Sequence, residues 1–254
     1  MTDSPPAIAR DAVTTAADYL RERFHDGNLD ADFTESDVKA SADREAERVV
    51  IDTIEDAYPD HAISAEESGD HPGRADRRWV VDALDGTNNF AAGIPTFGVA
   101  ATLVDDDGPR TTAVAVPVPG EVYVATRGEG VTYDGKRVQA VDGNGVDPAA
   151  ATVVSIIGLP VIEDDDRTHE HREMLDALRG ECKRVIETWA PVVYWGLLAR
   201  GRVGGFYCFH PAEREQVAGS LLAREAGCVE RSDGPLSVFA RDEKTAEALW
   251  STLH

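Results

Sequence analysis

The feature that most restricts the fold of this chain is an apolar segment that ends in acidic residues. Residues 79–90 read Trp-Val-Val-Asp-Ala-Leu-Asp-Gly-Thr-Asn-Asn-Phe and contain no lysine or arginine. The apolar part has the composition of a buried β-strand. An ionised carboxylate is costly to bury unless it is paired or bound to a metal. The chain must therefore fold so that Asp82 and Asp85 meet a cation from elsewhere.

A divalent metal ion would satisfy both acids at once. Oxygen-only ligation suits Mg²⁺ or Mn²⁺, and Asp82 and Asp85 can converge on such an ion together with the Leu84 carbonyl oxygen. Gly86 lets the backbone turn, so that the N–H groups of Gly86 and Thr87 are placed to receive a phosphate. Together these groups indicate metal-assisted transfer of a phosphoryl group to water.

A second acidic segment, Glu66-Glu67-Ser68, follows another short apolar run. Taken singly, each segment also has an ordinary structural explanation. Asp-Gly dipeptides are common turns, and adjacent glutamates commonly lie on a solvated surface. The functional interpretation therefore depends on the two segments lying together.

Hydrophobic periodicity predicts the framework around the acidic segments. Helices are expected at about residues 5–25 and 42–57, with Ser41 as the N-cap of the second. Strand patterns follow at 61–65, 78–83, 96–104, 111–118 and 121–126, and Asp134-Gly135 is typical of a hairpin turn. This part should form two helices against a mostly antiparallel sheet.

Beyond an expected linker at residues 142–145, strands and helices alternate. Strands are predicted at 152–157, 182–187 and 205–209, and helices at about 168–178, 192–200, 213–226 and 243–253. Alternation of this kind predicts an α/β arrangement with some parallel pairing. We therefore expect an α+β half over residues 1–140, carrying the acidic motifs, and an α/β half over residues 146–254.

The charge balance excludes some partners. With 47 acidic and 25 basic residues the net charge is −22, which argues against binding nucleic acid or an anionic membrane. Only four of the basic residues are lysines, a bias that resembles proteins of halophiles; an ordinary acidic protein is the alternative. The N-terminus lacks a signal-peptide pattern and the three cysteines are widely spaced, so a reducing, cytoplasmic location is expected.

Taken together, the motifs resemble the inositol monophosphatase superfamily of Mg²⁺-dependent phosphatases, which includes archaeal-type fructose bisphosphatases. That family carries Glu-Glu-Ser and then Asp-Pro-x-Asp-Gly-Thr-x-Asn-Phe, and here Ala83 replaces the proline. An upstream family motif with two aspartates corresponds to Asp37 and Asp43, without its Val-Thr. The resemblance implies a layered αβαβα sugar-phosphatase sandwich and, commonly, a homodimer.

The resemblance also implies roles for individual residues. Asp43 and Thr87 would orient and activate the attacking water, and the backbone of Gly86 and Thr87 would hold the phosphate. Two or three Mg²⁺ ions, or Mn²⁺, would be held by Glu66, Asp82, the Leu84 carbonyl, Asp85 and Glu215, with Glu67 a weaker candidate. Water would then attack in line, without a covalent enzyme intermediate.

The C-terminal half departs from the family pattern. Glu215 stands where the family has a metal-binding aspartate, and its extra methylene could weaken or rebuild a second metal site. Gly204 and Cys208 stand at two acidic positions that serve polyol recognition. The family's Gly-Ser/Thr-Ala-Ala helix opening is replaced by Trp189-Ala190-Pro191-Val192.

These departures leave the substrate open. Inositol monophosphate and fructose 1,6-bisphosphate are both candidates; for the latter, a cation near the second phosphate could come from Arg184, Arg200, Arg202 or Arg214, each of which could equally be surface arginine. An aromatic group could line a pocket or fill the core, namely Tyr194, Trp195, Phe206, Tyr207 and Phe209. Two functions remain: an active phosphomonoesterase with altered specificity, or a catalytically weakened paralogue acting as a metal-binding, phosphate-binding or partner subunit.

Overall fold

The computed structural model describes residues 4–27, 31–33, 38–74, 76–141 and 147–254, with the backbone alone at 31–33 and 38–40. Asp37 and the expected linker at 142–145 lie outside these residues. Among the described residues, no helix has both the length and the apolarity needed to cross a membrane.

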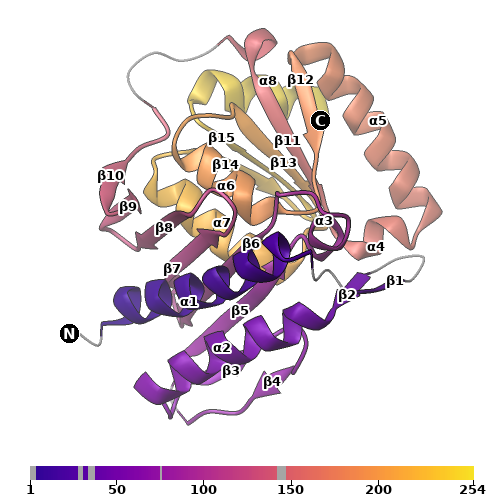
Figure 1. Cartoon of the computed structure of the whole chain (residues 1–254). Helices are drawn as coiled ribbons and strands as arrows, with labels where there is room; N and C mark the ends of the chain where they lie inside the picture. Colours follow the sequence, from indigo (N-terminus) through magenta and orange to yellow (C-terminus); the bar gives the residue numbers. More distant parts are fainter. Residues whose placement is uncertain (1–3, 28–30, 34–37, 75, 142–146) are drawn as a thin grey trace.

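Two long helices, α1 (Pro5–His25) and α2 (Ser41–Ala57), form the first layer. On α1 the buried residues recur at three- and four-residue spacing, from Ala9 to Leu20, so one face packs on the sheet beneath. α2 begins at Ser41 itself, directly after strand β2 (Val38–Ala40), so Ser41 is its first residue rather than the residue before it. Both helices cover the same face of the larger sheet (Figure 1).

That sheet has eight strands in the order β10-β9-β8-β7-β6-β5-β3-β4. All neighbouring pairs are antiparallel except β3 with β5. The sheet is therefore mostly antiparallel, as predicted from the sequence. The strands are β3 (Ala62–Ser64), β4 (Asp70–His71), β5 (Arg78–Asp85), β6 (Gly98–Asp105), β7 (Gly108–Val116), β8 (Glu121–Thr126), β9 (Gly130–Tyr133) and β10 (Lys136–Val138). After Arg78, every residue of β5 is buried, because helices cover both faces of the sheet.

The second sheet has five strands in the order β12-β11-β13-β15-β14. β11 pairs in parallel with both β12 and β13, and the remaining pairs are antiparallel. The strands are β11 (Thr152–Ile157), β12 (Arg184–Glu187), β13 (Gly205–Phe209), β14 (Val229–Asp233) and β15 (Leu236–Ala240).

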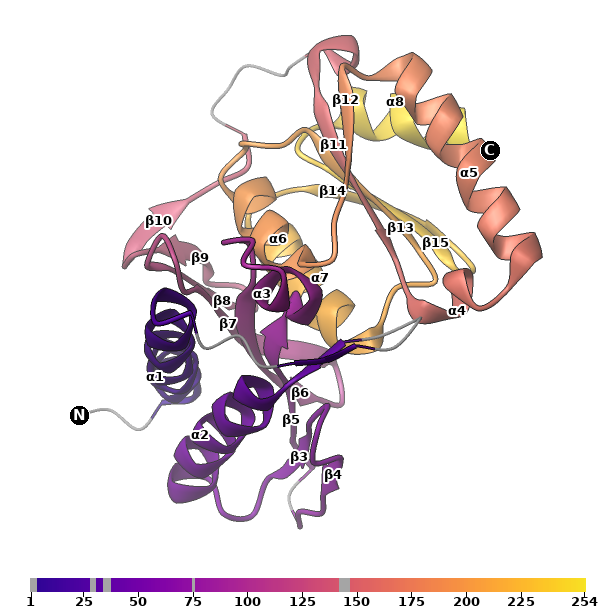
Figure 2. The same ribbon diagram turned by 45° about the vertical axis from the view of Figure 1, so that its right-hand side comes forward.

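Helices α6 (Pro191–Ala199) and α7 (Glu213–Glu225) lie between the two sheets (Figure 2). α6 is apolar on nearly all sides, as a helix enclosed by two sheets must be. α5 (Asp165–Glu181) and α8 (Glu243–Leu253) cover the outer face of the smaller sheet. The layers are therefore helix, sheet, helix, sheet, helix, which confirms the predicted αβαβα sandwich.

Periodicity missed several elements of the fold, most of them short or polar. These are β1 (Ala31–Phe33), β2, β4, α3 (Thr87–Ala91), η1 (Pro148–Ala150), α4 (Leu159–Ile162), β14 and β15. β14 reads Val-Glu-Arg-Ser-Asp and is partly exposed, so it has no apolar alternation to detect. The sequence predicted the layers correctly because the long elements carry the core.

Candidate active site

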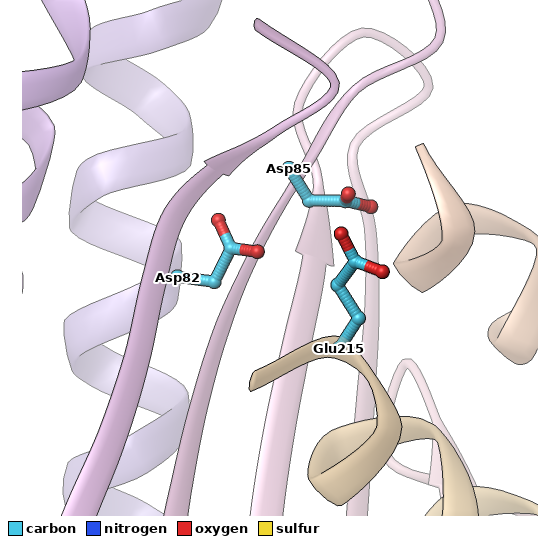
Figure 3. Close-up of side chains that lie close together, drawn as sticks. All are labelled: Asp82, Asp85 and Glu215. Carbon is cyan, nitrogen blue, oxygen red and sulfur yellow. The ribbon is translucent and has the colours of Figure 1, made fainter. Parts of the chain in front are cut away.

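Three carboxylates from two distant parts of the chain meet at the end of β5. Asp82 and Asp85 belong to β5, and Glu215 lies in the first turn of α7. One oxygen of each lies within 4.8 Å of the others, and the three side chains point toward one another (Figure 3). This is the convergence that a metal site requires.

A β-bulge explains how two residues of one strand can share this site. Asp82 pairs with Ala100 of β6, whereas Asp85 pairs with Gly98, so β5 holds one extra residue between them. In a regular strand, residues three apart point to opposite faces. The extra residue changes the phase of the strand, which allows both carboxylates to face the same side.

The electrostatics of the cluster favour a bound cation. Burial, followed by repulsion from neighbouring acids, raises the pKa of Asp82 and of Asp85 well above the usual value. Burial also raises the pKa of Glu215 to about 8, while the Arg214 guanidinium opposes this shift. Oxygen donors crowded in this way match the preferences of Mg²⁺ or Mn²⁺. The residues present therefore fit the ion that the sequence predicts.

Asp85 also ties the end of β5 to the helix that lies between the sheets. Its Oδ2 accepts a hydrogen bond of 2.7 Å from the backbone N–H of Val192, in the first turn of α6. Gly86, which follows Asp85, has a φ of +93°. A Cβ there would lie 2.8 Å from the Cβ of Ala190, so a glycine permits both the turn and the close approach of the α6 segment.

The Thr87 hydroxyl and the Asp43 carboxylate lie within hydrogen-bond reach of each other. The Thr87 hydroxyl is 3.0 Å from the Leu84 carbonyl oxygen and 3.4 Å from Asp43 Oδ2. Since a hydroxyl carries one hydrogen, it can donate to only one of them at a time. Burial, with the nearby charges of Glu66, Glu67 and Glu47, raises the pKa of Asp43 well above its usual value.

The two glutamates of the Glu66-Glu67-Ser68 loop lie differently. Glu66 is exposed and lines the cavity beside the cluster, although it is not one of the three converging acids. Glu67 is not among the residues that line this cavity, and its carboxylate pairs with Arg44 at 3.3 Å. Of the two glutamates, only Glu66 therefore faces the cavity.

Sequence reasoning missed Glu47, which fixes this loop. Glu47 is buried in α2 and accepts hydrogen bonds from the backbone N–H groups of Glu67 and Ser68, at 2.7 and 2.8 Å. It lies one helical turn after Asp43, on the apolar face of α2. In the sequence, an acidic residue on the otherwise apolar face of a helix was the signal that could have pointed to Glu47.

The cluster opens into a cavity of about 170 Å³ between the two sheets. Asn88, Thr188, Trp189 and Arg214 line it, together with the predicted residues Glu66, Asp82, Leu84, Asp85, Gly86, Thr87 and Glu215. Of the four arginines considered above, only Arg214 is among the lining residues. Arg200 instead pairs with Glu121 and stacks on Tyr133.

The residues at the family's polyol-binding positions lie away from the cavity. Cys208 is fully buried in the core, and it is not a lining residue. Gly204 leaves no room for a side chain, because a Cβ would lie 2.7 Å from the Cβ of Ala151. Four of the five aromatic residues considered above belong to the hydrophobic core. Trp195, Phe206, Tyr207 and Phe209 are almost fully buried.

Comparison with known proteins agrees with this geometry. Residues 3–250 match the inositol monophosphatase family. The chain belongs to this family. A curated relative, Nus factor SuhB of Salmonella typhimurium, is 34% identical over 193 residues, which cover 76% of this chain and 70% of that protein.

Solved structures show the same fold. The extragenic suppressor protein SuhB of Bartonella henselae superposes with a TM-score of 0.87 at 23% identity, covering 97% of each chain. The inositol monophosphatase of Anabaena gives a TM-score of 0.80 at 22% identity, covering 96% of this chain and 93% of that one. This inositol monophosphatase family member therefore shares the αβαβα sandwich of its relatives.

Proposed function

We propose that the protein is a Mg²⁺-dependent phosphomonoesterase that hydrolyses a small phosphorylated compound. The observation that carries this proposal is the convergence of Asp82, Asp85 and Glu215 in a cavity. Membership of a phosphatase family gives these acids a chemical context. Glu215 has one methylene more than the aspartate of the family pattern, and its carboxylate still lies in the cluster.

The metal-holding group in this proposal consists of Glu66, Asp82, the Leu84 carbonyl, Asp85 and Glu215, for two or three Mg²⁺ ions, with Mn²⁺ as a substitute. When bound, the ions supply positive charge to the phosphoryl group and acidify a water molecule. Glu67 remains the weaker candidate ligand because it faces Arg44.

The other residues would bind the substrate and move a proton. We assign the backbone of Gly86 and Thr87 to the phosphate, since the chain turns there at the start of α3. The Thr87 hydroxyl would hold the attacking water and pass its proton to Asp43, whose Oδ2 lies 3.4 Å away. Arg214 places positive charge in the same cavity.

A second candidate function is that of a weakly catalytic partner subunit. It is favoured by the burial of Cys208, which leaves no carboxylate for a polyol, and by the name Nus factor carried by the relatives. With a net charge of −22, such a subunit would bind another protein rather than nucleic acid.

Phosphate release distinguishes the two. The protein is assayed in high salt with Mg²⁺ on inositol monophosphate, fructose 1,6-bisphosphate and an aryl phosphate, with Mg²⁺ binding measured in parallel by calorimetry. Turnover of at least one ester, abolished by chelation of the metal, supports the phosphatase. Metal binding without turnover of any ester supports the partner subunit.

The working environment is part of the same proposal. We infer from the acidic, lysine-poor composition that the protein works in the cytoplasm of a salt-accumulating cell. We infer a homodimer because members of the family are commonly homodimers. A melting temperature that rises between low salt and molar KCl, with a dimer mass by light scattering, would support this inference. A salt-independent monomer would contradict it.

A further inference from the structure

An exposed tryptophan stands at the rim of the cavity. Trp189 is 47% exposed, and Leu159, the first residue of α4, is 42% exposed. Both line the same cavity as the three carboxylates. Large apolar side chains are costly to leave in water, so two of them at one functional cavity suggest an apolar ligand.

The segment that carries Trp189 is fixed on both sides. The Thr188 hydroxyl accepts a hydrogen bond of 3.1 Å from the N–H of Ala190, across Trp189. Three residues after Trp189, the N–H of Val192 is held by Asp85. The backbone that carries Trp189 is thereby tied to the end of β5, beside the carboxylate cluster.

The cavity therefore has two unlike sides. β5 and α7 contribute acids, whereas β11, α4, the segment before α6 and the first residue of α6 contribute Ile156, Ile157, Leu159, Trp189 and Pro191. The positions where the family recognises polyol hydroxyls hold Gly204 and the buried Cys208. A phosphate bound at the acidic side would direct its leaving group toward apolar carbon rather than toward carboxylates.

We propose that the preferred substrate is a phosphate monoester with a planar, apolar leaving group that packs against Trp189 and Leu159. This proposal rests on the proposed phosphatase function. In the reaction, water forms a new bond to phosphorus, the bond from phosphorus to the leaving oxygen breaks, and that oxygen ends with a proton. Contact with the indole provides binding in the ground state and the transition state alike, so its loss should raise KM and leave kcat unchanged.

The test compares phenyl phosphate with glycerol 2-phosphate and inositol 1-phosphate at saturating Mg²⁺. We expect the highest kcat/KM for phenyl phosphate. Trp189→Ala should raise the KM for phenyl phosphate by about tenfold, the size of one lost aromatic contact, and Trp189→Phe should recover most of it. The matched control is Ile94→Ala, which removes an apolar side chain that is 46% exposed and does not line the cavity. It should leave KM unchanged.

Binding gives a readout that does not need turnover. Trp79 and Trp195 are fully buried and Trp250 is partly buried, so Trp189 is the most exposed indole among the described residues. Phenylphosphonate, which is not hydrolysed, should change the tryptophan emission of the Mg²⁺-loaded protein, and Trp189→Ala should abolish the change.

The outcomes separate this proposal from the phosphatase function. The leaving-group preference would be overturned if the polyol esters gave an equal or higher kcat/KM than phenyl phosphate. It would also be overturned if Trp189→Ala changed the KM of all esters by the same factor. Either result would leave the proposed phosphatase function intact. Absence of turnover on every ester would overturn the phosphatase function. The phenylphosphonate titration would then decide by itself whether Trp189 binds an apolar phosphorus compound.

Discussion

Asp85 accepts the backbone N–H of Val192 at 2.7 Å, although 107 positions separate the two residues in the sequence. The contact joins the last residue of β5 in the larger sheet to the first turn of the helix that lies between the sheets. Oδ2 accepts this bond, and one oxygen of the same carboxylate belongs to the cluster with Asp82 and Glu215. The same residue therefore belongs to the carboxylate cluster and holds the start of α6 against the end of β5.

Replacing Asp85 with asparagine separates these two roles. The amide oxygen can still accept the N–H of Val192, so the Asp85→Asn protein should remain folded by circular dichroism. The lost charge should lower kcat by on the order of 10³-fold, comparable to removing a main electrostatic contact to the reacting group. A variant with the wild-type rate would contradict the metal assignment.

Glu215→Gln tests whether the longer acid is a working ligand. The variant keeps the shape of the side chain and removes its charge, so Mg²⁺ affinity should fall by about 10- to 100-fold in calorimetric titrations. Glu213→Gln is the matched control, because Glu213 is an exposed acid of the same helical turn and pairs with Arg78. Equal Mg²⁺ affinities for the two variants would show that Glu215 is not a metal ligand.

Glu47→Gln should disturb the loop that carries Glu66. The amide can accept one of the two backbone hydrogen bonds but would present a donor to the other, which costs about 1–3 kcal/mol of unfolding free energy. Chemical denaturation measures this cost, and kcat should fall with it. Glu45→Gln, which removes only the charge of a surface pair with Arg48, should change stability by no more than about 0.5 kcal/mol.

Gly86→Ala is expected to be more damaging than the same change in an open turn. At Gly86 the new Cβ would lie 2.8 Å from the Cβ of Ala190, whereas at Gly120, with a φ of +71°, it would meet nothing within 4 Å. Both variants carry the strain of a positive φ, about 1 kcal/mol or more. The excess loss of stability in Gly86→Ala therefore measures how closely Ala190 and the Thr96 carbonyl approach this residue, and similar losses in the two variants would contradict that close packing.

The metal-free protein should lose stability as the pH rises. The unfolded pKa of Glu215 is near 4.5 and its folded pKa is about 8, so the folded chain binds more protons between these values. Unfolding free energy must then fall from about pH 4.5 to pH 8. The raised pKa values of Asp82 and Asp85 act in the same direction.

Saturating Mg²⁺ should flatten this dependence, because the ion replaces the proton as the partner of the acids. Melting temperatures with EDTA and with Mg²⁺, at constant ionic strength, provide the measurement. Parallel curves under the two conditions would show that the acids do not bind the ion.

Much of the site could be predicted from local sequence. Asp82, Leu84, Asp85, Gly86 and Thr87 lie on one short stretch, and their chemistry can be inferred from its residue types and spacing. The long helices and central strands were predicted for a similar reason, because their apolar periodicity records which face is buried. The second acidic segment pointed to Glu66, and the family resemblance extended the prediction to Asp43 and Glu215, whose positions no local pattern gives.

Only the tertiary structure decided which residues surround that stretch. The bulge that turns Asp82 and Asp85 to one side depends on pairing with β6, and the Val192 contact depends on the docking of α6. Glu47 and Trp189 look like an ordinary helix acid and an ordinary loop aromatic until the sheets are packed. The sequence alone determined the chemistry of the acids, because ligand type is a property of the side chain. The structure decided which residues face these acids across the cavity, because the lining of the cavity depends on contacts between segments far apart in the chain.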